Sequence, residues 1–268
     1  MTTPAPVVRA QPRLAYRVLE RRVTFMVLAL LLGLAGVAWW STVERSRGMG
    51  GMGVGLGTVA MAMMPVDAGV FVTMWVTMMV AMMFPTIAPV VLLHRMVMRR
   101  ASAGPATSVA FAAGYLAVWT LSGLVPLAIL VVVRHAAAGF GWVAPASGAA
   151  LIIAGLYQFS GWKRACQRAC QTPLTFLATH QFGSGWRGAA RTGVAHGLYC
   201  FGCCWALMAV LFVVGLMNLV WMIAITVIFL LEKHVRHAQH VSWVVGGVVT
   251  VLGFAILLHP ELLSSISS

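Results

Sequence analysis

Apolar residues occur along this chain in long, uninterrupted runs that short polar and basic segments separate. The runs are much longer than the roughly ten-residue alternating segments of a membrane barrel. An apolar run of about 18–25 residues crosses the bilayer core as a helix. The pattern predicts an all-α polytopic transmembrane helix bundle of about seven spans. The spans are expected at residues 23–40, 68–93, 107–133, 144–161, 192–216, 218–231 and 241–259.

The polar segments divide the chain into three parts. Residues 1–22 are expected to form a basic cytoplasmic tail, residues 23–260 the transmembrane bundle, and residues 261–268 a short C-terminal tail. The run at 218–231 is short, and the charge-free stretch around Asn218 predicts a tight hairpin with the run before it.

Composition and charge support a membrane protein and exclude some functions. Of 268 residues, 61% are apolar and 9% are charged, whereas a soluble domain carries about 25% charged residues. The net charge is +13. The basic residues lie between apolar runs and not on one soluble face, which excludes a nucleic-acid-binding protein. The expected environment of the chain is therefore the lipid bilayer.

The basic residues also indicate an orientation. With the N-terminus inside, only Arg45, Arg47 and Arg134 of the 18 Lys and Arg residues fall in outer segments. Inner loops carry the excess of Lys and Arg, so the N-terminus is expected in the cytoplasm and the C-terminus outside. The expected location is the inner (plasma) membrane of the cell.

Acidic residues are too few for a proton relay or a paired-carboxylate hydrolase. The chain has 5 Asp and Glu, and none lies in the middle of an expected span. A proton relay or a paired-carboxylate hydrolase needs buried acids. The sequence therefore favours a function other than catalysis.

Sulfur is abundant instead. Twelve of the 17 Met residues fall between Met49 and Met98. Helical spacing places four of them on adjoining rows of one helix face in the second span: Met78, Met79, Met82 and Met83. The face is either packing, which is the usual role of Met, or a row of thioether ligands.

A second face carries thiols and an imidazole. At about 100° per residue, His196, Cys200, Cys203 and Cys204 occupy an arc of about 100° on the fifth span. Thiolate, imidazole and thioether groups suit Cu(I), and the first two also suit Zn. The alternative is that these cysteines are small buried apolar residues.

Two further cysteines lie in the expected inner loop. Cys166 and Cys170 are four residues apart, on one side of a short helix that Pro173 is expected to end. Neighbouring Lys and Arg residues favour thiolates. The pair is either a metal relay or redox pair, or two incidental thiols.

Span orientation places the Met face and the Cys/His face at overlapping depths in the inner half of the membrane. The hairpin around Asn218 would bring Glu232 near His196, as a ligand or as an acceptor that orients the imidazole. We assign Glu232 and Tyr199 to this supporting role. The alternative for Glu232 is an interfacial ion pair with Lys233 or Arg191.

Three segments resemble the signatures of a known family. The first is Trp75-x-x-Met78-Met79-x-Ala81-Met82-Met83-x-Pro85. The second is Gly155-Leu156-Tyr157-Gln158 with Lys163-x-x-Cys166-x-x-x-Cys170-x-x-Pro173. The third is His196-Gly-x-Tyr199-Cys200-x-Gly202-Cys203-Cys204-Trp205, with Met217-Asn218 and Glu232-Lys233. Residues 65–235 thus resemble the predicted metal-binding integral membrane proteins of unknown function, whose members are sometimes labelled copper chaperones. The resemblance implies metal binding, with a copper ion favoured.

Three functions fit these observations. The first is copper handling, as a chaperone, an assembly factor or a permease, with a copper enzyme or another membrane subunit as its partner. The second is a membrane thiol oxidoreductase. The third is a structural subunit of a membrane complex. Zinc is the alternative metal.

Overall fold

The computed structural model describes residues 11–49, 67–100, 104–135, 142–180, 183, 185–216 and 218–263. Within these ranges every regular element is a helix, as the apolar runs predict. The helices are α1 (Gln11–Met49), α3 (Ala68–Arg100), α4 (Ala106–Ser122), α5 (Leu124–His135), α6 (Val143–Tyr157), α7 (Gly161–Gln171), α8 (Pro173–Thr179), α9 (Trp186–Val214), α10 (Leu219–His234) and α11 (Ala238–Leu258).

Five stretches are long and apolar enough to cross a membrane. They lie in α1, α3, the consecutive pair α4 and α5, α9 and α11. Helices α6 and α7 meet the same criterion only as a pair, and the pair is bent by 61°. Helix α10 has 16 residues, about 24 Å at 1.5 Å per residue, and falls short of it. The structure thus supports five or six of the seven expected spans.

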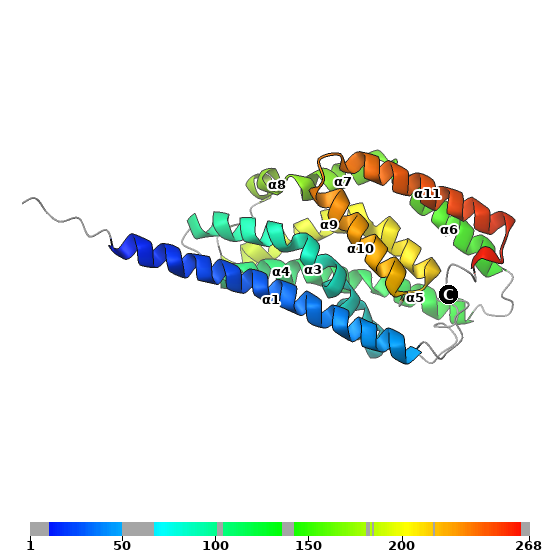
Figure 1. Ribbon diagram of the computed structural model, residues 1–268, viewed down its shortest axis with the longest axis horizontal. Helices are drawn as coiled ribbons and strands as arrows, with labels where there is room; N and C mark the ends of the chain where they lie inside the picture. The colour runs from blue at the N-terminus through cyan, green and yellow to red at the C-terminus, as the bar shows by residue number, and fades with distance from the viewer. Residues whose placement is uncertain are drawn as a thin grey trace, which may run out of the picture.

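Helices α3 and α9 form the centre of the molecule. In their apolar stretches 61% and 56% of the residues are buried, against 17% for α1. Figure 1 shows α1 beside α3 on one side and α6 beside α11 on the other, with α9 and α10 between them. The Met face and the Cys/His face of the sequence therefore lie on the two most buried helices.

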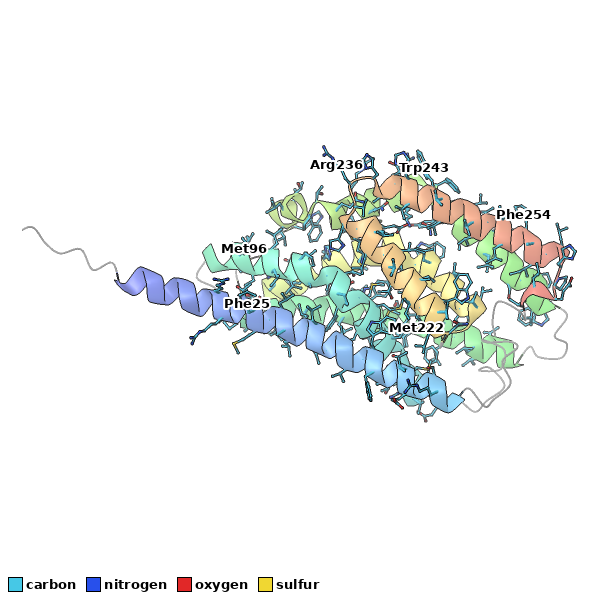
Figure 2. All side chains as sticks on the ribbon, in the orientation of Figure 1. Phe25, Met96, Met222, Arg236, Trp243 and Phe254 are labelled. Atoms are coloured by element: carbon cyan, nitrogen blue, oxygen red, sulfur yellow. The ribbon has the colours of Figure 1, made fainter. Side chains whose placement is uncertain are left out.

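The outer helices expose apolar side chains. Phe25 on α1 and Phe254 on α11 point away from the bundle and are more than half exposed, while Met222 on α10 points inward and is fully buried (Figure 2). Such an apolar surface would be unfavourable in water and matches the acyl chains of a bilayer.

Glycines allow α4 and α9 to approach closely. A Cβ atom added at Gly193 would overlap the carbonyl oxygen of Phe111, and one added at Gly114 would overlap that of Ala190. Small residues at helix contacts are typical of membrane bundles, where close packing drives association. This contact fixes the height of α9, and so of its cysteines, against α4.

A tight hairpin joins α9 and α10, as the sequence predicts. Helix α9 ends at Val214, and the next residue, Gly215, has a φ of 110° that few residues other than glycine adopt. The side chain of Asn218 then caps α10 by accepting from the Trp221 amide. The stretch of α9 from Cys200 to its end is as long as the stretch of α10 from its start to Lys233. Because the two legs of the hairpin are equal, Lys233 returns to the level of Cys200.

We expect Gly193→Ala to destabilise the bundle. The added methyl must push α4 away from α9, and such overpacking costs about 1–3 kcal/mol. Thermal unfolding of the detergent-solubilised protein measures this as a lower Tm. The control is Gly247→Ala on α11, where a Cβ atom meets nothing within 4 Å. Equal Tm values for the two variants would contradict the close-contact role of Gly193.

Candidate metal centre

Three buried cysteines from two helices converge in the core. The Sγ atoms of Cys170 on α7 and of Cys200 and Cys203 on α9 all lie within 4.8 Å of one another, and those of Cys170 and Cys203 are 3.9 Å apart. We call these residues the thiol cluster. Three thiols this close can hold one soft cation of low coordination number.

Local sequence explains how α7 supplies its cysteine. Ser160 caps the helix by accepting from the Lys163 amide at 3.1 Å, and Pro173 starts the next helix, so α7 ends at Gln171. Its inward face is Lys163, Gln167 and Cys170, all buried. The short helix ended by Pro173 is therefore confirmed, and its second cysteine is the one that faces the core.

The other two cysteines lie beside the thiol cluster. The Sγ atom of Cys204 is 3.3 Å from that of Cys203. Cys166 is half-buried one turn before Cys170, and its sulfur lies against α9 at Gly202, where an added Cβ atom would be only 2.6 Å away. Gly202 thus makes room for the Cys166 thiol.

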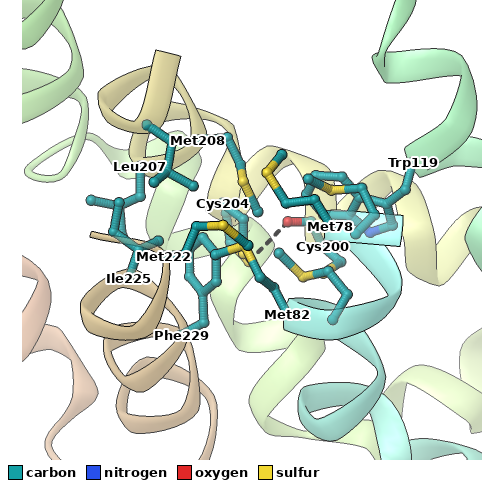
Figure 3. Close-up of a cluster of buried hydrophobic side chains, with 14 of the residues drawn as sticks. Met78, Met82, Trp119, Cys200, Cys204, Leu207, Met208, Met222, Ile225 and Phe229 are labelled. Carbon is teal, nitrogen blue, oxygen red and sulfur yellow. Dashed lines mark hydrogen bonds between the residues drawn. The ribbon is translucent and has the colours of Figure 1, made fainter. Parts of the chain in front are cut away.

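Four thioethers surround the thiols of α9. Figure 3 shows Met78 and Met82 of α3, Met208 of α9 and Met222 of α10 directed toward Cys200 and Cys204. The four expected Met residues, 78, 79, 82 and 83, are all at most 2% exposed. Met222 lies in a different apolar run, so helical spacing along the second span does not identify it.

His196 is buried among aromatic rings and is not one of the three residues of the thiol cluster. Its imidazole contacts Phe111, Tyr115 and Phe176, with centroid distances of 6.0, 6.1 and 5.0 Å. Within the described residues its Nδ1 atom has no hydrogen-bond partner. The group of three ligand atoms within 4.8 Å contains Cys170 in place of this histidine.

Two polar groups converge on Cys200. Its sulfur lies 3.1 Å from Lys233 Nζ and 3.1 Å from the Tyr115 hydroxyl. The same ammonium donates to Thr86 Oγ1 at 3.0 Å and to Met83 Sδ at 3.9 Å. One nitrogen atom therefore contacts both the Met83 and the Cys200 sulfurs, so the Met face of α3 and the cysteine face of α9 meet at Lys233.

The spacing of sulfur and imidazole groups along the sequence does not identify Lys233 or Tyr115 as parts of the site. Both were detectable in principle, since an ammonium at the end of an apolar run and a phenol inside one must each find a partner within the bundle.

Glu232 binds Lys163 and not His196. Its carboxylate accepts from Lys163 Nζ at 2.7 and 2.8 Å and from Ser242 Oγ at 2.8 Å. Tyr199 contacts a different histidine, with its hydroxyl 3.4 Å from His180 Nε2. Glu232 therefore supports the site by holding α7, and with it Cys170, in place.

Comparison with known families gives one match. Residues 72–256, about two thirds of the chain, match the family described as "PpoB2: Copper chaperone". The matched segment contains all five cysteines, Lys233 and the four expected Met residues of α3, which are Met78, Met79, Met82 and Met83. No curated protein and no solved structure matches the chain. The resemblance inferred from the sequence motifs is confirmed, and the chain belongs to the PpoB2 copper chaperone family.

Proposed function

We propose that this protein is a membrane copper chaperone that carries Cu(I) as its cargo on the thiol cluster of Cys170, Cys200 and Cys203. The observation that carries the proposal is the convergence of three buried sulfurs, from two helices, within 4.8 Å. The family match favours copper over zinc as the metal.

The spacing of the thiols suits a metal ion. Metal–thiolate bonds of about 2.3 Å in a trigonal arrangement place the sulfurs about 4 Å apart. The separation between Cys170 and Cys203 is 3.9 Å, and no pair in the thiol cluster exceeds 4.8 Å. Small side-chain rotations therefore suffice to bind an ion. Thiolate is also the ligand type that selects soft Cu(I).

The sulfur atoms around the thiol cluster could form a path along which the ion is transferred. Cys204 adjoins the thiol cluster, and Met78, Met82, Met208 and Met222 continue from it toward α3 and α10 (Figure 3). Neutral thioethers bind Cu(I) more weakly than thiolates, so an ion on them is readily passed on. We assign Cys204 and these Met residues, with Met79 and Met83, to transfer. Cys166 and His196 flank the thiol cluster as secondary positions, and the recipient is a copper enzyme or another membrane subunit.

We propose seven membrane passes with the N-terminus inside, of which five or six meet the criteria of length and hydropathy. In Figure 1, α1, α9 and α11 run one way along the molecule, and α3, α6 and α10 run the other way. Helices α4 and α5 together supply the third pass. Helix α6, before the bend to α7, then serves as the fourth pass, and α10 serves as a short sixth. The basic segments gather at one end, which the positive-inside rule assigns to the cytoplasm of the inner membrane.

We expect Cys170→Ser to lose stoichiometric copper, because two thiols remain where three enclosed the ion. The matched control is Cys166→Ser, one turn earlier on α7 and outside the thiol cluster. Purified proteins are loaded with Cu(I) under anaerobic conditions. Elemental analysis then gives copper per chain, and X-ray absorption gives the number of sulfur ligands. If wild type and Cys170→Ser bind the same amount of copper per chain with the same number of sulfur ligands, the ligand assignment is overturned.

A second experiment tests the orientation. Reporter fusions placed after Arg100 and after Arg187 should be active in the cytoplasm, and one placed after Gly141 should be active outside, because these positions lie at opposite ends of the proposed passes. A fusion after Gly141 that reports from the cytoplasm would invert the topology.

A further inference from the structure

Lys233 places a positive charge at the edge of the thiol cluster. Its Nζ atom contacts groups from two other helices: the Cys200 sulfur at 3.1 Å, the Thr86 hydroxyl at 3.0 Å and the Met83 thioether at 3.9 Å. It also lies 5.8 Å from the centre of the Phe229 ring. The ammonium is therefore held in one place by α3, α9 and α10.

The charge of Lys233 is directed at the thiol cluster because the neighbouring acid is engaged elsewhere. The Glu232 carboxylate is bound by Lys163 and Ser242. The hydrogen bonds of Lys233 within the described residues go to a thiol, a hydroxyl and a thioether, and none goes to a carboxylate. A cation inside an apolar bundle needs a negative partner, and Cys200 is the group placed to supply it as a thiolate.

A fixed cation discriminates between metal ions by their charge. Coulomb repulsion between the ammonium and an ion bound to Cys200 is proportional to the charge of that ion, so it is twice as large for Zn²⁺ as for Cu⁺. This difference in repulsion between the two ions does not depend on how many thiolates bind, provided that both ions are bound by the same number. Salt screens this difference little, because the thiol cluster is buried and Lys233 is partly buried.

We infer that Lys233 determines the specificity of the thiol cluster for a monovalent soft ion over a divalent one. Three cysteine thiolates alone are also good ligands for Zn²⁺. The thiols select for softness, and the ammonium adds selection for low charge. This inference rests on the proposed function, because it concerns the ion that the same thiol cluster binds.

The test is the ratio of Zn²⁺ affinity to Cu⁺ affinity, measured by competition with chelators on the detergent-purified full chain. Lys233→Gln and Lys233→Met both remove the charge, and the Met variant suits the apolar contacts with Met83 and Phe229. We expect the ratio to rise about tenfold or more in both variants. Lys233→Arg keeps the charge and should keep the ratio near that of wild type. If Lys233 had only a structural role, replacing it would lower the affinity for both ions together and leave the ratio unchanged.

The outcomes separate the inference from the proposed function. If wild type binds Cu⁺ and a folded Lys233→Gln or Lys233→Met variant has the same affinity ratio as wild type, the inference about Lys233 is overturned. The proposed function then still stands. A ratio in Lys233→Arg as high as in the neutral variants overturns the inference about Lys233 as well. Wild type that binds no Cu⁺ at all overturns the proposed function itself.

Discussion

The buried ion pair between Lys163 and Glu232 is the interaction on which the rest of the site depends. Both side chains are at most 2% exposed, and both carboxylate oxygens accept from the same ammonium. Ser242 donates to the carboxylate, and Gln158 accepts from the ammonium. A buried charge pair is tolerated only when its remaining hydrogen-bonding capacity is satisfied. Four residues from three helices and the bend before α7 provide that here.

The same contacts attach a polar helix to an apolar bundle. The backbone carbonyl of Glu232, in the last turn of α10, accepts from the side chains of Gln167 at 3.0 Å and Gln171 at 2.7 Å. Such terminal carbonyls have no partner within their own helix. Successive residues on a helix point about 100° apart, so Glu232 faces α7 while Lys233 faces Cys200. One end of α10 therefore positions cysteine-bearing segments on both α7 and α9.

Helical spacing predicted the parts of the site that belong to a single helix. The buried Met face of α3, the shared face of Cys200, Cys203 and Cys204, and the hairpin at Asn218 all follow from local sequence. Spacing along one helix does not say which neighbour packs against it. That Cys170 joins Cys200 and Cys203, while His196 lies among rings, depends on the 61° bend between α6 and α7. The bend is a tertiary feature, stabilised by Glu232 from a helix much later in the chain.

The span count shows the same limit. Hydropathy identifies the long apolar helices well. Helices α6 and α10 are only 15 and 16 residues long, and contacts with neighbouring helices determine their positions. Helix α6 packs along α11, and α10 is tied back by Asn218. The hydropathy of the sequence predicts such short helices poorly, because contacts with neighbouring helices, and not the thickness of the lipid core, determine where they end.

The dependence of α7 on Glu232 and Ser242 has a consequence for biosynthesis. All five cysteines have been translated by residue 204, but the groups that hold α7 against α9 are on α10 and α11. A nascent chain halted before residue 232 would contain every thiol and still lack the contact that brings Cys170 to its partners. The thiol cluster is therefore completed only after the segments that carry Glu232 and Ser242 have been made and packed against α7.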